Sequence, residues 1–393
     1  HNFISYIILT IVVLSYFWVI LSDYLNLKAL NPNLPDEMSD TYNSEKYKKS
    51  QLYTKEKTQF GFINETLMFI LTIFMLLFDG FALVNTIVCN WFENPIWQAL
   101  TFFGIIASIV SIIGLPFDYY FTFVIEEKYG FNKSTKKTYW LDKIKGLLLS
   151  TIIGGGIGYL LLWIIISMPN SFVLWTFIVI ASFSIFFAMF YTLLIVPLFN
   201  KLTPLPEGEL RTAIEEFSQK TGFKLKNIYS IDGSKRSTKA NAYFSGLGPK
   251  KTIVLFDTLI ELLSPQEVVA VLAHEIGHNK KQHIVKSLIL SLLSTAAMLF
   301  ILQIIFKYQI FSQALGVEQI KIHISLIVFG ILLEPISTFI NIFTNSLSRK
   351  FEFQADNYAK SHNLAQELIS SLKKLSVNNL SNLTPHKLNV LLN

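Results

Sequence analysis

Long apolar stretches alternate with polar segments along most of the chain. Seven of these stretches reach the roughly 20 residues that a helix needs to cross a bilayer. They run approximately over residues 3–21, 67–88, 96–114, 147–168, 172–196, 285–306 and 322–343. The first stretch lacks both a basic segment before it and a small-residue cleavage site after it, so we interpret it as a membrane anchor. The pattern therefore predicts a mostly α, polytopic membrane protein with seven transmembrane helices.

One polar segment, residues 200–283, is long enough to fold as a soluble domain between spans. Apolar residues recur at helical spacing through its first part, at Leu210, Ile214 and Phe217. Short runs typical of strands follow at residues 227–231, 242–244 and 252–256. We therefore expect a small α+β domain whose edge strand can pair with an extended peptide.

The last helix of this segment has a recognisable beginning. Ser264 stands at the N-cap position, Pro265 at the first helical position and Glu267 three residues after the cap, which is the pattern of a capping box. An apolar run follows and carries the helix forward. Gly277, inside this helix, is unfavourable there by about 1 kcal/mol relative to Ala. We expect a glycine at this position because another element must approach the helix closely.

The same helix carries the candidate chemistry. Residues 274–278 read His-Glu-Ile-Gly-His and match the motif H-E-x-x-H. Residues four apart share one face of a helix, so His274 and His278 can offer two imidazole nitrogens to one Zn²⁺. Glu275 then lies beside the metal as the candidate general base. The motif also occurs by chance, so its helical context carries the argument.

A hydrolytic zinc site needs a third protein ligand. The only cysteine, Cys89, is far away in an apolar stretch, and His283 lies off the ligand face of the helix. The better candidate is Glu352, because Asp356 shares its helical face and can hold a ligand histidine by the other ring nitrogen. Arg349, one turn earlier, can neutralise surplus carboxylate charge or hold a substrate oxygen. The alternative is that this segment is a solvated amphipathic helix.

Composition and charge place this chemistry at a membrane. Hydrophobic residues make up 52% of the chain and charged residues only 15%. The polar segments after the first and third apolar stretches contain six lysines each, whereas those after the second and fourth contain neither Lys nor Arg. By the positive-inside rule, the N-terminus is outside and the 200–283 segment and the C-terminus are cytoplasmic. Cys89 should then lie at the outer end of the second span.

These observations divide the chain into four parts. Residues 1–199 form a membrane region with five helices, 200–284 a cytoplasmic protease domain, 285–343 the last two spans, and 344–393 a cytoplasmic helical region with the third ligand. The lysine-rich loops account for the net charge of +6, so a lipid bilayer is the expected partner and nucleic acid is not. The alternatives to a membrane zinc peptidase are a quality-control protease and a transporter with a fortuitous motif.

Several separated segments, in the same order, resemble the type I CAAX prenyl endopeptidases, which are integral-membrane zinc metalloproteases. The segments are FVIEEKYGFN at 123–132, PLPEG at 204–208, GSKRS at 233–237, NAYF at 241–244, IVLFD at 253–257, HEIGH at 274–278 and FEFQAD at 351–356. The resemblance extends over nearly the whole chain. It implies seven transmembrane helices that enclose a chamber, with one zinc ion near its cytoplasmic end.

The resemblance also implies roles and a reaction. His274, His278 and Glu352 are the implied zinc ligands, Glu275 the general base, and Asn241 a contact to the substrate backbone. A turn cap before the strand is the alternative for Asn241. The implied substrate is a protein or peptide prenylated at a C-terminal CAAX motif, from which the last three residues are removed. The expected membrane is the bacterial inner membrane or the endoplasmic reticulum of a eukaryote. The short connection before Ser264 favours the bacterial membrane.

One departure concerns the two ends of the sequence. Family members usually continue past this region with a His-Tyr-Ser-His-Pro-type segment that contributes a substrate-contacting histidine, whereas this sequence stops at Asn393. It also begins with His1 rather than Met. We therefore expect either that the sequence is a fragment or that this version lacks full activity.

Overall fold

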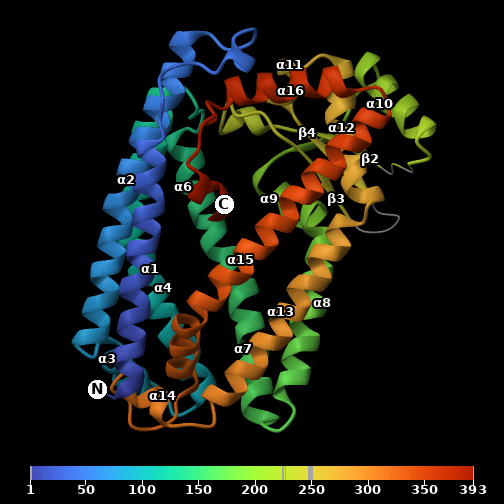
Figure 1. Ribbon diagram of the computed structural model, residues 1–393. Coiled ribbons are helices and arrows are strands. Elements are labelled where there is room, and N and C mark those ends of the chain that lie inside the picture. The colour runs from blue at the N-terminus through green and yellow to red at the C-terminus, as the bar shows by residue number, and fades with distance from the viewer. Residues whose placement is uncertain (1, 224, 226, 247–250, 393) are drawn as a thin grey trace.

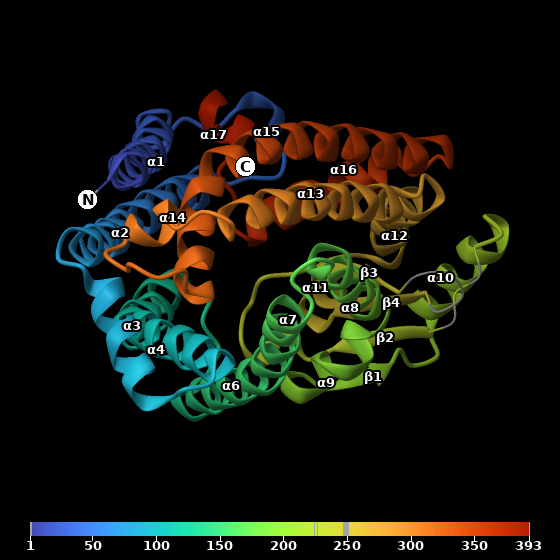
Figure 2. The ribbon, with the colours of Figure 1, turned by 90° about the horizontal axis from the view of Figure 1, so that it is seen from below.

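The structure is a computed structural model that describes residues 2–223, 225, 227–246 and 251–392. Seven long apolar helical segments in it are candidate membrane spans. They are α1 (Phe3–Lys28), α2 (Ser44–Leu77), α4 (Pro95–Tyr120) with its continuation through Tyr129, α6 (Lys136–Leu149) with α7 (Gly155–Ser167), α8 (Phe172–Leu194) with α9 (Val196–Phe199), α13 (His283–Ile305) and α15 (Ile322–Ser361). The predicted number of spans is confirmed, and Figure 2 shows these helices arranged in a ring.

Shorter elements join these spans. The turn η1 (Asp36–Met38) lies between α1 and α2, and α14 (Ile310–Gln313) lies between α13 and α15. Two π-helical stretches, η2 (Phe121–Glu126) and η3 (Ser150–Gly154), continue α4 and α6 without ending the helix, and α5 (Glu127–Tyr129) completes the third span. Several spans are therefore long rods that extend beyond the thickness of a bilayer, which a helix crosses in about 20 residues.

The predicted second span, residues 67–88, is wrong in its boundaries. Helix α2 ends at Leu77, and a separate helix α3 (Gly80–Trp91) begins after a turn in which Asp79 has φ 53°. A left-handed residue of this kind ends a helix, so the second span belongs to α2, whose apolar residues lie in its later part and end at Leu77. Asp79 lies at this corner, with its carboxylate against Gly316, and not in the middle of a span.

The two ends of the helical ring differ. The N-terminus, α3 and α14 lie at one end, and the sheet with the motif helix α12 (Pro265–Lys280) lies at the other (Figure 1). Cys89, which belongs to α3, is thus at the end remote from the soluble domain. This relative placement agrees with the topology expected from the lysine-rich loops. The compartment at each end stays a prediction.

The soluble domain is built around a four-stranded sheet with the order β1-β2-β4-β3. The strands are β1 (Leu202–Pro204), β2 (Asn227–Ile231), β3 (Ala242–Ser245) and β4 (Thr252–Phe256), and only the β2–β4 pair is parallel. Three of them match the predicted runs closely. β1 was not predicted, because its residues read as a proline-rich turn. Among the residues that the structure describes, β3 pairs on one side only, so it is the edge strand that the sequence led us to expect.

Helices cover this sheet and form its core. The helix α10 (Glu209–Lys220) presents Ile214 and Phe217 to the interior, as its apolar spacing predicted, and α11 (Asp257–Leu262) contributes the buried Leu259. Helix α12 lies in the same core with Val268 and Ile276 fully or almost fully buried. The 3₁₀ turn η4 (Gly233–Lys235) follows β2 and begins the connection to β3. The motif helix is therefore fixed along its apolar side.

The capping box of α12 is present as predicted. The Ser264 side chain accepts a hydrogen bond from the Glu267 backbone, and the Glu267 carboxylate accepts one from the Ser264 amide. Glu267 also bonds Lys374 and Ser370 of helix α16 (Ala365–Asn378), both through its carboxylate oxygens. Burial alone would raise the pKa of Glu267, but its hydrogen bonds with Lys374, Ser370 and Ser264 lower it to about 2. The start of the motif helix is thus locked to α16.

Candidate metal centre

The candidate metal centre forms where α12 and α15 cross. Gly277 lies at the contact, because a Cβ atom added there would come within 2.9 Å of the Tyr358 Cβ and 3.0 Å of the Ala355 Cα. Only a residue without a side chain permits this approach. The expectation that Gly277 allows a close approach to the motif helix is confirmed.

Three side chains converge at this crossing. The Nε2 atoms of His274 and His278 lie 3.1 Å apart. A carboxylate oxygen of Glu352 lies 3.3 Å from the His274 Nε2, and the other lies 3.6 Å from the His278 Nε2. These side chains form a group of potential metal ligands whose donor atoms all lie within 4.8 Å of one another. The alternative for the Glu352 segment, a solvated amphipathic helix, does not account for this convergence.

The spacing of these donors fits zinc. Four tetrahedral ligands at about 2.0–2.1 Å from the metal lie about 3.3 Å from one another, and the three observed separations bracket this value. The donor set of two imidazole nitrogens and one carboxylate is one that catalytic zinc sites use, with a fourth position left open. The Glu352 side chain is 54% exposed, whereas those of His274 and His278 are 15% and 19% exposed. The open side of the site therefore lies next to the carboxylate.

Asp356 orients the first histidine. Its carboxylate lies 2.8 Å from the Nδ1 of His274, on the far side of the ring from the donor Nε2. A carboxylate in this position accepts the Nδ1–H proton and leaves the Nε2 lone pair free for a metal. Glu352 and Asp356 lie one helical turn apart on α15, as their spacing predicted.

A second histidine contact was missed by the sequence analysis. The Nδ1 of His283 lies 3.0 Å from the Nδ1 of His278, and its Nε2 lies 2.9 Å from the Gln354 side-chain oxygen. The His283 ring also stacks on Phe351, with centroids 4.1 Å apart. α12 ends at Lys280, and Gln282, with φ 58° at the N-cap of α13, turns the chain so that His283 returns toward the site. His283 is thus outside the group of potential metal ligands but supports one of its histidines.

Burial shapes the electrostatics of the site. It raises the pKa of Glu275, an effect that His274 opposes and Glu352 reinforces. It also lowers the pKa of His278, which favours the neutral form of this ring. A neutral imidazole is the form that binds a metal, and a carboxylate with a raised pKa is a better proton acceptor near neutral pH.

The two remaining predicted residues lie elsewhere. Arg349 donates from Nη1 to the Val390 carbonyl at 2.9 Å, so it holds the C-terminal helix α17 (Lys387–Leu392) against α15. Asn241 lies directly before the edge strand β3, and its side-chain oxygen accepts a hydrogen bond of 2.9 Å from the Ala242 amide. Its carbonyl accepts from the Phe256 amide at 3.1 Å. Both the substrate role and the turn-cap role of Asn241 are compatible with these contacts.

Family comparisons cover both halves of the chain. Residues 23–201 match a family described as the CAAX prenyl protease N-terminal region with five membrane helices. Residues 204–385 match peptidase family M48. The first match ends just before β1, and the second begins at the last residue of that strand.

Individual relatives cover almost the whole chain. CAAX prenyl protease 1 of Saccharomyces cerevisiae is 35% identical, over 90% of this chain and 84% of its own length. The CAAX prenyl protease 1 homolog of Homo sapiens is 32% identical, over 88% of this chain and 83% of its own length. The crystal structure of S. mikatae Ste24p superposes with a TM-score of 0.92 at 34% identity, and covers 100% of this chain and 96% of that one.

Proposed function

The chain belongs to the CAAX prenyl protease branch of peptidase family M48, and we propose that it is a membrane zinc endopeptidase that removes the terminal tripeptide of prenylated CAAX proteins. The observation that carries this proposal is the convergence of His274, His278 and Glu352, whose spacing suits one zinc ion per chain. The names of the relatives support the substrate class.

Each residue of the site has one part in the reaction. When bound, zinc supplies the Lewis acidity that activates both the scissile carbonyl and the attacking water. Glu275 accepts a proton from that water and returns it to the departing amine. Asp356 holds the His274 ring in the tautomer that presents Nε2.

The edge strand β3 supplies the alignment. Its outer side is free of other strands in the described part of the chain, so an extended peptide can add to the sheet by backbone hydrogen bonds. Asn241, at the beginning of this strand, has a side chain that can donate to a substrate carbonyl and accept from a substrate amide. The peptide is thereby held with its scissile bond in a reactive orientation.

We place the active site at the cytoplasmic face of the membrane. The lysine distribution supports this orientation, and the relatives named above are eukaryotic, which favours the endoplasmic reticulum over a bacterial inner membrane. Cys89, in α3 at the far end of the helical ring, is the sole cysteine and serves as the probe. A membrane-impermeant thiol reagent should label it from the non-cytoplasmic side only. Labelling from the cytoplasmic side alone would reverse the topology.

The decisive experiment measures metal and product together. Purified protein should contain one zinc ion per chain by elemental analysis and release a tripeptide from a farnesylated CAAX peptide, detected by mass spectrometry. Cleavage of unfolded membrane proteins at internal bonds, without tripeptide release, would instead support a quality-control protease. Protein without stoichiometric zinc would contradict the assignment as a zinc peptidase and would favour the transporter alternative.

A further inference from the structure

The connection between β2 and β3 links the candidate substrate strand to the membrane helices. It runs from Asp232 to Asn241 and contains the Gly-Ser-Lys-Arg-Ser segment that the catalytic chemistry leaves unexplained. Its middle pairs with the segment that follows α5. Lys133 donates its amide to the Arg236 carbonyl at 3.0 Å, and Thr238 donates to the Phe131 carbonyl at 3.1 Å. The connection is thus bonded by its backbone to the membrane region.

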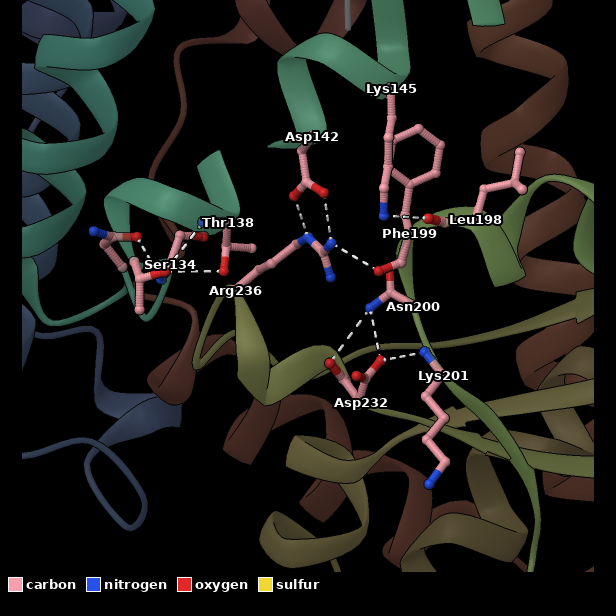
Figure 3. Close-up of polar contacts among 12 residues, drawn as sticks. Ser134, Thr138, Asp142, Lys145, Leu198, Phe199, Asn200, Lys201, Asp232 and Arg236 are labelled. Atoms are coloured by element: carbon pink, nitrogen blue, oxygen red, sulfur yellow. Dashed lines mark hydrogen bonds and ion pairs between the residues drawn. The ribbon is translucent and has the colours of Figure 1, made fainter. Parts of the chain in front are cut away.

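Arg236 adds a side-chain junction to this backbone pairing. Its guanidinium donates to both carboxylate oxygens of Asp142, on α6, at 2.7 and 2.9 Å (Figure 3). Its Nη2 also donates to the Phe199 carbonyl at the end of α9, at 2.7 Å. The two charged side chains are only 23% and 24% exposed. A bidentate ion pair of this kind fixes the orientation of the two side chains as well as their distance.

The start of the connection is bonded to the residues that follow α9. The Asp232 carboxylate accepts from the Lys201 amide at 2.7 Å and from the Asn200 side chain at 3.1 Å (Figure 3). Asn200 and Lys201 directly follow α9, so the start of the connection is bonded to the end of the fifth span. The connection is therefore tied to the fifth span at Asp232, and to both the fourth and the fifth spans at Arg236.

The end of the connection is held by three further elements, α2, η2 and the C-terminal end of α16. The Lys239 ammonium lies 3.0 Å from the Glu126 carboxylate and 3.1 Å from the Tyr53 hydroxyl, and it lies over the Phe131 ring. The next residue, Ala240, has its amide and its carbonyl bonded by the side chain of Asn379, at 3.1 and 3.3 Å. Residues 236 and 238–240 are thus each bonded to a partner outside the connection, Ser237 lies opposite Asn132 in an isolated bridge, and the next residue is Asn241.

We propose that the Arg236–Asp142 and Lys239–Glu126 ion pairs position the edge strand β3 for substrate, so that the membrane helices set the alignment of the scissile bond. This proposal rests on the proposed function of β3. In the described part of the chain, β3 has a sheet partner on one side only and is four residues long. Its far end bonds Thr192 of α8 through Ser245, so the place of its first residues depends on how its beginning is held. Reaction rates are sensitive to such placement, because a displacement of about 1 Å can lower a rate about 10²-fold. Arg236 and Lys239 are therefore positioning residues, remote from the reacting atoms.

The test uses the full chain in lipid nanodiscs with Asp142→Asn and Lys239→Met. We expect kcat/KM on the farnesylated CAAX peptide to fall about 10- to 100-fold in each, with zinc content and thermal midpoint close to those of the unchanged protein. Amides of residues 242–245 should exchange with deuterium faster. Arg236→Lys keeps the charge but not the bidentate geometry, so it should lose part of its kcat/KM. The control is Glu215→Gln, which breaks the exposed Arg211–Glu215 pair on α10 and should change none of these measurements.

The outcomes separate this proposal from the proposed function. Unchanged kcat/KM, unchanged exchange in β3, or a loss of activity that follows loss of zinc or of folding would each overturn the positioning role. The double exchange Asp142→Arg with Arg236→Asp should recover part of the lost kcat/KM if the pair acts by position. If the unchanged protein does not cleave the CAAX peptide, the proposed function fails, and the exchange rates of β3 still decide whether the ion pairs position the strand.

Discussion

The metal centre and the edge strand β3 are held by two different kinds of contact. Two of the three candidate ligands come from one helix, four residues apart, and the third comes from a helix that crosses it at Gly277. β3 instead begins at a connection held by α2, η2, α6, α9 and α16. The metal centre is thus local to two helices, whereas the strand is supported from most of the molecule. Changes at the centre should act on chemistry and metal, and changes around the strand on alignment.

The largest effect is expected at the centre, from Glu275→Gln. The amide cannot accept the proton from water, so kcat should fall about 10²- to 10⁴-fold. Zinc content should stay at one ion per chain, because Glu275 is not among the candidate ligands. Single-turnover kinetics and elemental analysis measure the two quantities on the same preparation. A variant that keeps most of its kcat would remove Glu275 from the role of general base.

Glu352→Gln should act on the metal instead. A neutral amide is a weaker ligand than a carboxylate, and even the loss of a residue that only orients a ligand costs about 10- to 100-fold in metal affinity. We therefore expect zinc to dissociate at least 100-fold more readily, as measured by competition with a chelator. Asp356→Asn, which changes only the partner of His274, serves as the milder comparison. Zinc retention equal to that of the unchanged protein would show that Glu352 is not the third ligand.

Asn241→Ala probes the strand side of the comparison. The loss of its side-chain hydrogen bonds to substrate should lower kcat/KM about 10- to 100-fold and leave zinc content and thermal midpoint unchanged. If Asn241 is instead a turn cap, the thermal midpoint should drop, because its contact with the Ala242 amide is lost. Unchanged turnover would remove it from substrate alignment.

The smallest expected effect lies at the start of the motif helix, where Glu267 joins α12 to α16. Hydrogen bonds lower the folded pKa of Glu267 from 4.5 to about 2. A depressed carboxyl pKa contributes stability that is present above pH 4.5 and is lost as the pH falls toward 2, which amounts to about 1–3 kcal/mol. Thermal unfolding followed between pH 6 and pH 3 should therefore show a steeper acid loss in the unchanged protein than in Glu267→Gln. Equal slopes would mean that the Glu267–Lys374 pair contributes nothing measurable.

The features that the sequence predicted well are those decided by residues close to one another along the chain. The spacing of apolar residues identified the spans and α10, and the runs 227–231 and 252–256 became β2 and β4 with the same boundaries. The pair of histidines and the capping box depend on neighbours within about one helical turn, so a single helix decides them. Hydropathy gave the wrong boundaries for the second span at residues 67–88, because it measures apolarity and takes no account of the left-handed turn at Asp79.

Tertiary structure alone decided which distant residues meet. The sequence by itself determined a membrane protein with a zinc-type helix and a plausible third ligand, because these features follow from composition and from helical periodicity. It did not determine that Gln282 turns His283 back onto His278, or that Arg349 bonds α17. Nor did it determine that Arg236 and Lys239 meet Asp142 and Glu126, which lie about a hundred residues earlier in the chain. Such contacts depend on how helices pack, and packing is set by the whole set of side chains rather than by any local pattern.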